Sequence, residues 1–368
     1  MTMSYRCATA LAFATAFVLT AIPAHAQGTS AGKWEIEAHG GFASATTPSG
    51  GSAGTLPAAT PLSTLPFSQP SRRISSWFFG DGTSLLNSVN ANIGGVPLDA
   101  RLTALDPVIT SAPASRDSGG NFGFRIARRI GSRYFAEGTV DFANTPLKFS
   151  QKALDGINAS SSSFVRAFRG LFASGPSQNP NVTAPVTFTG ENGHEVLTTG
   201  VFGVDLLTHG RLIPYVVGGG GIAHATGDLP AATITGNYTF PIPVPNIAPI
   251  NETDRIAIRV VRDDNVAVGV FGGGVRYAAS PRWGVRFDVR ASVGGGASDV
   301  VIDATPTVAT TTGTSVILVS PTIPSAVFST SQFSNSSLSG PAISGLKTFS
   351  GSGTSVRTNI VGGVYFRF

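Results

Sequence analysis

Alternation of apolar residues with polar or small residues is the dominant pattern of the chain, and it is clearest at the C-terminal end. There Ile360, Val364, Phe366 and Phe368 share one side of a period of two that continues to the last residue. Such a period predicts a β-strand whose two faces meet different surroundings. The terminal residue is expected on the apolar face.

Eight segments carry this pattern, and none needs more than the roughly 9 to 11 residues with which a tilted strand crosses a bilayer. Beyond the N-terminal region, no segment approaches the run of about 20 apolar residues that a membrane helix requires. The predicted strands are Lys33–Ala43, Asn121–Ile130, Arg133–Ala143, Glu195–Leu206, Leu212–Ala223, Val266–Tyr277, Trp283–Val293 and Ser355–Phe368.

Short and long connections alternate between these segments. Gly131–Ser132, Leu207–Arg211 and Ala278–Arg282 have hairpin lengths. The four other connections run to roughly 40 to 75 residues, far beyond ordinary loops. Outer-membrane barrels have short periplasmic turns and long extracellular loops, whereas a soluble β-sandwich has no reason to sort its connections in this way. The long loops cover about 44–120, 144–194, 224–265 and 294–354.

We therefore predict an all-β fold, an antiparallel transmembrane β-barrel of eight strands with both termini on the periplasmic side. The last strand is expected to close the barrel by pairing with the first, near Trp34–Phe42. A barrel of ten strands is the alternative, because the apolar run Val316–Val319 in the last long loop could supply another hairpin. Three aromatics beside the short turns are expected to form a girdle at the inner membrane interface: Tyr134, Tyr277 and Trp283.

The inward positions of the predicted strands are rich in charge of both signs. An eight-stranded barrel is only wide enough for side chains to fill it, and an unpaired buried ion is costly. The lumen is therefore expected to be a salt-bridged plug and not a water-filled pore. With the first tight turn centred on Gly131, Arg125 should lie opposite Glu137. The predicted lumen network comprises Arg125, Arg129, Glu137, Asp141, Glu195, Asp205, Arg286, Asp288, Arg290, Arg357 and Arg367.

The long loops contain elements of their own. The adjacent aromatics Trp77–Phe79 are expected to form a hydrophobic cluster that caps the barrel mouth, with a partner-binding patch as the alternative. Ser150–Phe172 has apolar residues near one helical face and predicts a helix with Ser150 as its N-cap. This helix is expected on the outer leaflet or over the rim. Ala232–Phe240 and Arg255–Val261 alternate well enough to extend the fifth and sixth strands above the membrane.

The N-terminus has the pattern of a secretory signal peptide. Arg6 precedes an apolar run that reaches Ile22, and the small-residue sequence Ala24-His25-Ala26 follows. We expect cleavage after Ala26, which makes 1–26 the signal peptide and 27–368 the barrel with its large loops. A membrane anchor is the weaker alternative, because the apolar run is short and ends in Pro23.

Composition narrows the class of protein further. The only cysteine of the sequence, Cys7, lies in the signal peptide. The mature chain is therefore expected to have no disulfide, no thiolate metal site and no cysteine nucleophile. Removal of residues 1–26 leaves 24 Lys and Arg against 20 Asp and Glu. Because these few charges form no basic cluster, no nucleic acid partner is expected.

Enzymatic motifs are missing from the sequence. Gly218-x-Gly220-x-x-Ala223 fits a dinucleotide fingerprint, but neither an amphipathic helix nor the expected acidic residue follows it. None of the mature histidines has a metal-binding spacing, so no metal or other cofactor is expected. His39 alone lies well inside a predicted strand, where a structural role is favoured over a catalytic one. The sequence thus predicts a protein that is not an enzyme.

The chain resembles the superfamily of small outer-membrane β-barrels that includes opacity-type, OmpA-type and OmpW-type proteins. The resemblance lies in the export signal, the eight strands, the turn Ala279–Gly284 and the end Tyr365–Phe368. It implies a location in the bacterial outer membrane, with outer-membrane lipid, lipopolysaccharide and the barrel assembly machinery as partners. In that superfamily the terminal strand is the assembly signal, a role that falls here on Ile360, Val364, Phe366 and Phe368.

Two hypotheses for function follow. The first is a barrel with a charge-paired lumen that presents long surface loops for a structural or surface-interaction role. The second is a small porin or uptake channel gated by the first loop. The sequence identifies neither a ligand nor a surface partner.

Overall fold

The structure of the protein is a computed structural model that describes residues 33–48, 50–61, 72–92, 98–173, 181–240, 249–310, 327–328 and 336–368. The predicted signal peptide and the apolar run Val316–Val319 lie outside these residues.

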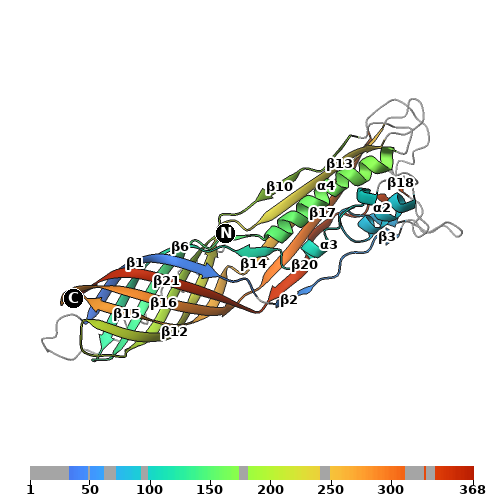
Figure 1. The fold of residues 1–368 in the computed structure, drawn as a ribbon. Helices are drawn as coiled ribbons and strands as arrows, with labels where there is room; N and C mark the ends of the chain where they lie inside the picture. The colour runs from blue at the N-terminus through green and yellow to red at the C-terminus, as the bar shows by residue number, and fades with distance from the viewer. Residues whose placement is uncertain are drawn as a thin grey trace.

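Eight antiparallel strands close into a barrel in the order β1-β21-β16-β15-β12-β11-β7-β6 (Figure 1). All eight predicted strands are present, and no further strand enters the barrel within the described residues. The C-terminal strand pairs with β1, from Glu35 opposite Arg367 to Ala45 opposite Arg357, which confirms the predicted closure. The barrel strands are β1 (Trp34–Ala45), β6 (Gly119–Ile130), β7 (Tyr134–Ala143), β11 (His194–Asp205), β12 (Leu212–Thr226), β15 (Asn265–Ala278), β16 (Trp283–Gly295) and β21 (Thr354–Arg367).

The two faces of the barrel wall differ as the alternation predicts. On the outside, the side chains of Phe122, Phe287 and Val364 are 58%, 54% and 58% exposed. Arg286 and Asp288, the charged residues on either side of Phe287 in β16, point inward and are buried. A barrel that is apolar outside and polar inside matches a lipid environment and not an aqueous one.

One register prediction is wrong. Arg125 lies opposite Thr139, and Ala127 lies opposite Glu137. The β6–β7 turn has three residues, 131–133, and begins at Gly131 with φ +88°. Turn length sets the register of a hairpin, so the centre of this turn falls one residue later than predicted and the pairing shifts by two.

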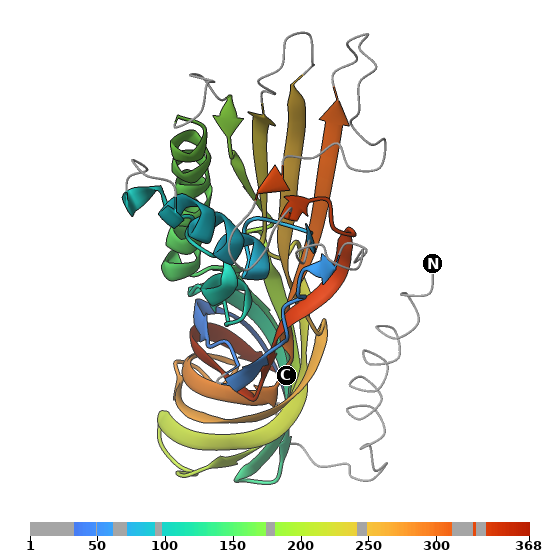
Figure 2. The ribbon, with the colours of Figure 1, turned by 90° about the vertical axis from the view of Figure 1, so that its right-hand side faces the viewer.

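The long connections are largely folded into a second sheet, which continues from one end of the barrel (Figures 1 and 2). We call this end of the barrel the loop end and the opposite one the turn end. The third long loop supplies two paired strands as predicted, although residues 227–230 separate them from β12. The sheet is ordered β10 (Val186–Thr189), β13 (Ala231–Phe240), β14 (Ile250–Arg262), β17 (Ser298–Thr310), β20 (Ile343–Ser352), β2 (Gly50–Ala53), with β9 (Val182–Thr183) also on β13.

Helices cover one face of this second sheet (Figure 2). The predicted helix is present as α4 (Gln151–Ala173), and the Ser150 hydroxyl accepts a hydrogen bond from the Ala153 amide at 3.3 Å. It packs on β9, β10 and β13, so its apolar face is covered by protein. The remaining elements are α2 (Gly80–Asn92), η1 (Leu98–Ala100), α3 (Asp106–Ile109), β3 (Thr60–Pro61), β4 (Arg72–Ile74), β5 (Ala114–Arg116), β8 (Leu147–Phe149), β18 (Val327–Phe328) and β19 (Ser336–Leu338).

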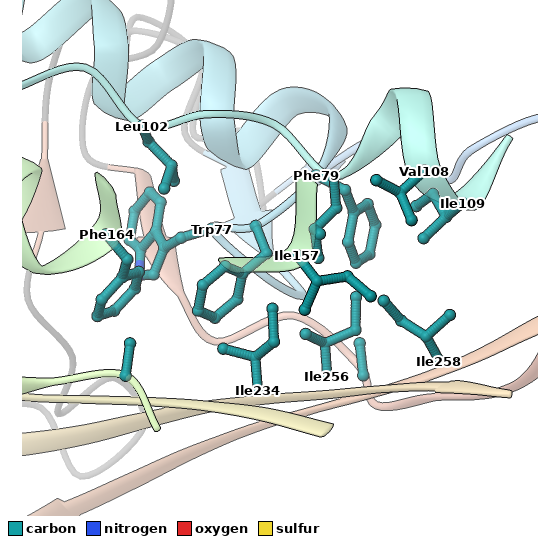
Figure 3. Packing of buried hydrophobic residues seen from close by; sticks show 14 of the residues in the cluster. Trp77, Phe79, Leu102, Val108, Ile109, Ile157, Phe164, Ile234, Ile256 and Ile258 are labelled. Carbon is teal, nitrogen blue, oxygen red and sulfur yellow. The ribbon is translucent and has the colours of Figure 1, made fainter. Parts of the chain in front are cut away.

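A large hydrophobic core lies between the helices and the second sheet (Figure 3). Trp77 and Phe164 pack against the sheet residues Ile234 and Ile256, and all four are fully buried. The aromatic triplet of the first loop thus forms a hydrophobic cluster, as predicted. The cluster belongs to the core of this outer layer and is not merely a cap on the barrel mouth.

Candidate functional site

The barrel interior holds the largest concentration of buried charge in the described residues. Inward side chains of β1 mark three successive levels, with Glu35 near the turn end, Glu37 in the middle and His39 above it. A fourth level at the loop end is built around Glu195 of β11. Strand alternation places these groups inside, because every second residue of each strand faces the lumen.

At the turn-end level, two carboxylates hold three arginines. Asp205 accepts short hydrogen bonds from Arg129 and Arg276. Glu35 pairs with Arg367 at 3.1 Å and with Arg276 at 3.8 Å. The contacts tie β1, β6, β11, β15 and β21 together near the turns.

The central level is organised by Arg286 of β16, whose side chain is fully buried. Its Nη2 lies 2.8 Å from Oε2 of Glu137, and its Nη1 lies 3.3 Å from Oε2 of Glu37. Its Nε donates to the hydroxyl of Tyr215 at 2.6 Å. In the ring of strands, β16 stands four places from β7, so the bond between Arg286 and Glu137 crosses the full width of the barrel.

Two further arginines complete the central level. Arg125 lies 2.7 Å from Glu37, 2.9 Å from Glu137 and 2.7 Å from Asp288. Arg290 lies 2.6 Å from Glu137 and 2.9 Å from Asp288. The predicted pair of Arg125 and Glu137 therefore exists, although the two residues are not opposite in the ladder, because the long arginine side chain reaches across the shift.

The two upper levels each have one main pair. His39 Nε2 lies 2.7 Å from Asp141 Oδ1, and its Nδ1 lies 3.6 Å from Glu37. Arg357 of β21 holds Glu195 of β11 through two hydrogen bonds of 2.7 and 2.8 Å. These two strands are also four places apart, so a second bond crosses the lumen.

Apolar side chains and glycines fill the space between the charges. Leu197 and Val201, which interrupt the polar face of the fourth strand, lie buried beside Phe135 and Tyr215 in the lumen. A Cβ added to Gly203 would fall 2.1 Å from the Phe135 ring. The ring in turn lies 4.6 Å from the Arg276 guanidinium. The interior is packed closely enough that a methyl group has no room at this position.

All eleven predicted lumen residues lie in the interior; ten of them pair with an opposite charge, and Asp141 is hydrogen-bonded to His39. Arg129 and Arg367 are half-buried and the others are buried. The prediction missed Glu35, Glu37 and Arg276, which are as buried as the residues it included. The alternation of inward and outward residues could have identified the missed carboxylates, because Glu35 and Glu37 stand between the outward residues Trp34, Ile36 and Ala38.

The predicted outer residues lie on the lipid-facing surface. Tyr134, Tyr277 and Trp283 are 49%, 41% and 50% exposed beside the short turns. The four apolar residues assigned to the assembly signal are exposed on the outside, Ile360, Val364 and Phe366 on β21 and Phe368 directly after it. Phe368 is held at the barrel seam by two backbone hydrogen bonds with Trp34, of 3.0 and 3.1 Å.

The described part of the chain holds no group of three or more histidine, cysteine, aspartate or glutamate side chains arranged for a metal ion. None of its helices is both long and apolar enough to cross a membrane.

A closed eight-stranded barrel with an apolar exterior and a charged interior defines a transmembrane β-barrel protein. Among solved structures, the chain is similar to the outer membrane protein OprG from Pseudomonas aeruginosa, with 11% identity and a TM-score of 0.35 over 94% of this chain and 99% of that chain. It is also similar to the outer membrane protein AlkL in DMPC lipid bilayers, with 12% identity and a TM-score of 0.33 over 94% and 95%. No protein-family model and no curated protein matches the sequence.

Proposed function

We propose that the protein is a non-enzymatic outer-membrane barrel with a closed, charge-paired lumen, whose task is to hold the folded outer layer at the cell surface. The observation that carries this proposal is the pair of ionic contacts across the lumen. Arg286 reaches Glu137 on the opposite wall, and Arg357 reaches Glu195 on the opposite wall. Two such crossings at different heights, with the side chains of Leu197, Val201, Phe135 and Tyr215 buried in the same interior, support a lumen closed to water.

The energetics of the central level support a permanent closure. Its arginines and carboxylates are balanced in number, with Arg125, Arg286 and Arg290 facing Glu37, Glu137 and Asp288. Removing one partner of such a buried cluster leaves an uncompensated charge, which typically costs about 3–5 kcal/mol. Opening a path through the cluster would separate several of these pairs at once.

Conductance in planar bilayers tests the closed lumen. We expect the purified barrel to give no steady current, because its wall-to-wall pairs occlude the interior. Replacing both members of each crossing with alanine, Arg286 with Glu137 and Arg357 with Glu195, should admit small ions, whereas Phe287→Ala on the outside should stay closed. A steady current from the unaltered protein would contradict the proposal and favour a small porin gated by the first loop.

The orientation and the surroundings belong to the same proposal. The turn end faces the periplasm, the outer layer faces the medium, and lipid and lipopolysaccharide surround the apolar wall.

The chain is exported by a signal peptide cleaved after Ala26, so N-terminal sequencing of the mature protein should begin at Gln27. His39 serves the lumen network through Asp141 and has no catalytic task. Protease added to intact cells should cut the outer layer and leave the barrel.

The terminal strand is proposed as the part that the barrel assembly machinery recognises. Deletion of Phe368 removes its backbone hydrogen bonds with Trp34 at the seam. We expect the amount of folded, heat-modifiable barrel in the outer membrane to fall several-fold. Phe124→Ala is the matched control, because Phe124 is 62% exposed in the middle of a strand and away from the seam. Equal accumulation of the two variants would deny the terminal residue a special role.

A further inference from the structure

A repeated pair of residues stands at the turn end of the barrel, the end that carries the C-terminus in Figure 1. Each of the four barrel strands that start there is preceded by a cation, and its own first residue is an aromatic residue or leucine. The short turns differ in length, yet the pair recurs at the same point of each strand. The four pairs are Lys33-Trp34 on β1, Arg133-Tyr134 on β7, Arg211-Leu212 on β12 and Arg282-Trp283 on β16.

Backbone hydrogen bonds place the four cations at equivalent points of the rim. The carbonyl of each cation accepts a hydrogen bond from the neighbouring strand where the ladder ends. Because β1, β16, β12 and β7 alternate with the other four strands around the barrel, the cations are evenly spaced. The donors are the amides of Arg129 to Lys33 at 2.9 Å, Asp205 to Arg133 at 2.8 Å, Ala278 to Arg211 at 2.8 Å and Arg367 to Arg282 at 2.6 Å. We call these four cations the cationic ring.

No acidic side chain neutralises the cationic ring. All four of its side chains are exposed, and none forms an ion pair within the described residues. The turns 131–133, 206–211 and 279–282 contain no Asp or Glu. The carboxylates of the turn-end level, Glu35 and Asp205, are buried and already hold three arginines. The lumen network therefore leaves no carboxylate for the ring.

The loop end of the barrel carries charge of the opposite sign. Two connections, 227–230 and 263–264, lead from barrel strands to strands of the second sheet. They contain Asp228, Asp263 and Asp264, all exposed, and no Lys or Arg. The cationic ring is thus a local feature and does not follow from the small positive net charge of the chain.

The adjacent aromatics fix the level of the ring in a bilayer. Tyr and Trp favour the headgroup level of a membrane, and Tyr134 and Trp283 are 49% and 50% exposed at the turn end. The cation before each lies one residue, roughly 3.4 Å, further toward the lipid phosphates. On β6, the Arg128 guanidinium lies 5.3 Å from the centre of the Trp34 ring, a further cation beside an interfacial aromatic.

The ring can act on headgroups through its field. Its four positions share the lumen side of the strand alternation, but they stand beyond the paired levels, at the narrow rim of an eight-stranded barrel. A charge at such a rim acts over about one Debye length, roughly 8 Å at physiological salt. Attraction of a lipid phosphate therefore needs no direct contact.

We propose that the cationic ring selects anionic phospholipids, of the phosphatidylglycerol type, in the leaflet that surrounds the turn end. A cation held near a membrane surface favours anionic over neutral lipid roughly fivefold at low salt. The aromatic or leucine residue of each pair anchors the strand start at the headgroup level. The proposal requires only that the barrel spans a bilayer, so it is independent of whether the lumen conducts and of what the outer layer does.

Brominated lipids measure this preference, because the protein carries its own probes. Of its three tryptophans, Trp34 and Trp283 stand beside cations of the ring, whereas Trp77 is buried in the outer layer and gives a constant background. In phosphatidylcholine vesicles, quenching by brominated phosphatidylglycerol and by brominated phosphatidylcholine gives the relative binding constant of the two lipids. We expect phosphatidylglycerol to be favoured about three- to fivefold at low salt. The preference should fall toward equality at about 0.5 M salt.

A glutamine variant of all four ring positions locates the effect. Lys33→Gln, Arg133→Gln, Arg211→Gln and Arg282→Gln together should bring the two lipids close to equality. The matched control replaces one lysine and three arginines exposed on the outer layer with glutamine and should keep the preference. Both variants lose four charges, and heat-modifiable mobility shows that each is folded. The control positions are Lys152, Arg166, Arg169 and Arg255.

Two further samples separate a lipid surface from other anion sites. Lysine at all three arginine positions of the ring should retain the preference, since the field requires a charge and not a guanidinium. Inorganic phosphate in place of chloride, at equal ionic strength, should leave the quenching unchanged. A selective loss in phosphate, equal quenching by both lipids in the unaltered protein, or equal preferences in the ring variant and its control overturns the proposal.

Discussion

Replacing Arg286 with methionine is expected to destabilise the barrel by about 3–5 kcal/mol, the usual cost of breaking a buried ionic cluster on one side. The substitution keeps an unbranched side chain of similar reach but removes the bonds to Glu137, Glu37 and Tyr215. The loss should be measured as the free energy of unfolding in urea, in lipid vesicles, with the mobility of the folded band as the signal.

The matched control is Arg259→Met. Arg259 also stands on a strand and lies 2.7 Å from a carboxylate, that of Asp303, but its side chain is 48% exposed. Water screens such a pair, so its loss should cost less than about 1 kcal/mol. Adding Glu137→Gln to Arg286→Met should recover about 1–2 kcal/mol, because it removes part of the stranded negative charge. Equal costs for the two arginine variants would refute a lumen held together by ion pairs.

The barrel could be predicted from the sequence because each of its strands contacts lipid on one face. That contact demands an apolar residue at every second position, as in the run from Trp283 to Val289, and a period of two is visible without knowledge of the partner strand. The same rule identified the inward charges. Apart from the pair of Arg125 and Glu137, it did not identify which of them meet, because residues such as Arg286 and Glu137 stand on opposite walls and contact across the lumen and not along the ladder.

The outer layer was less predictable because its contacts are distant in the sequence. Strand β2 of the first long loop pairs with β20 of the fourth, and β14 pairs with β17 across different loops. Alternation reveals a strand such as Ala231–Phe240 but not its neighbours. The aromatics of Trp77–Phe79 signalled a buried cluster, yet the surface that buries them comes from α4 and the second sheet. Arg116 was missed because it lies in the first long loop by sequence and approaches Glu195 only in the fold.

A buried acid makes the outer layer sensitive to pH. Asp254 on β14 is fully buried, and its Oδ2 accepts hydrogen bonds from the Trp77 amide at 2.6 Å and the Ser76 hydroxyl at 3.1 Å. Its Oδ1 has no hydrogen-bond partner. Burial outweighs both hydrogen bonds and raises the pKa of Asp254 from 3.8 to about 7. The neighbouring Tyr238 stays neutral, since burial and Glu252 hold its pKa well above the usual range.

This shift fixes the sign of the pH dependence. Between the unfolded pKa of 3.8 and the folded pKa of about 7, the folded layer binds the Asp254 proton and the unfolded chain does not. Stability of the layer should therefore be highest at low pH, fall as pH rises through this window and level off above it. At about 1.4 kcal/mol per pKa unit, the full loss is on the order of 4 kcal/mol.

Hydrogen exchange of β13 and β14 peptides, corrected for the intrinsic effect of pH, measures this loss as the free energy of local opening. Asp254→Asn keeps an oxygen for the Trp77 and Ser76 donors but cannot ionise, so its opening free energy should vary little across the window. Asp228→Asn changes an exposed carboxylate and should retain the slope of the unaltered protein. Barrel peptides serve as an internal reference within each sample. If the slope persists unchanged in Asp254→Asn, the pH dependence comes from another group. The pKa of Asp254 is then not raised in the folded layer.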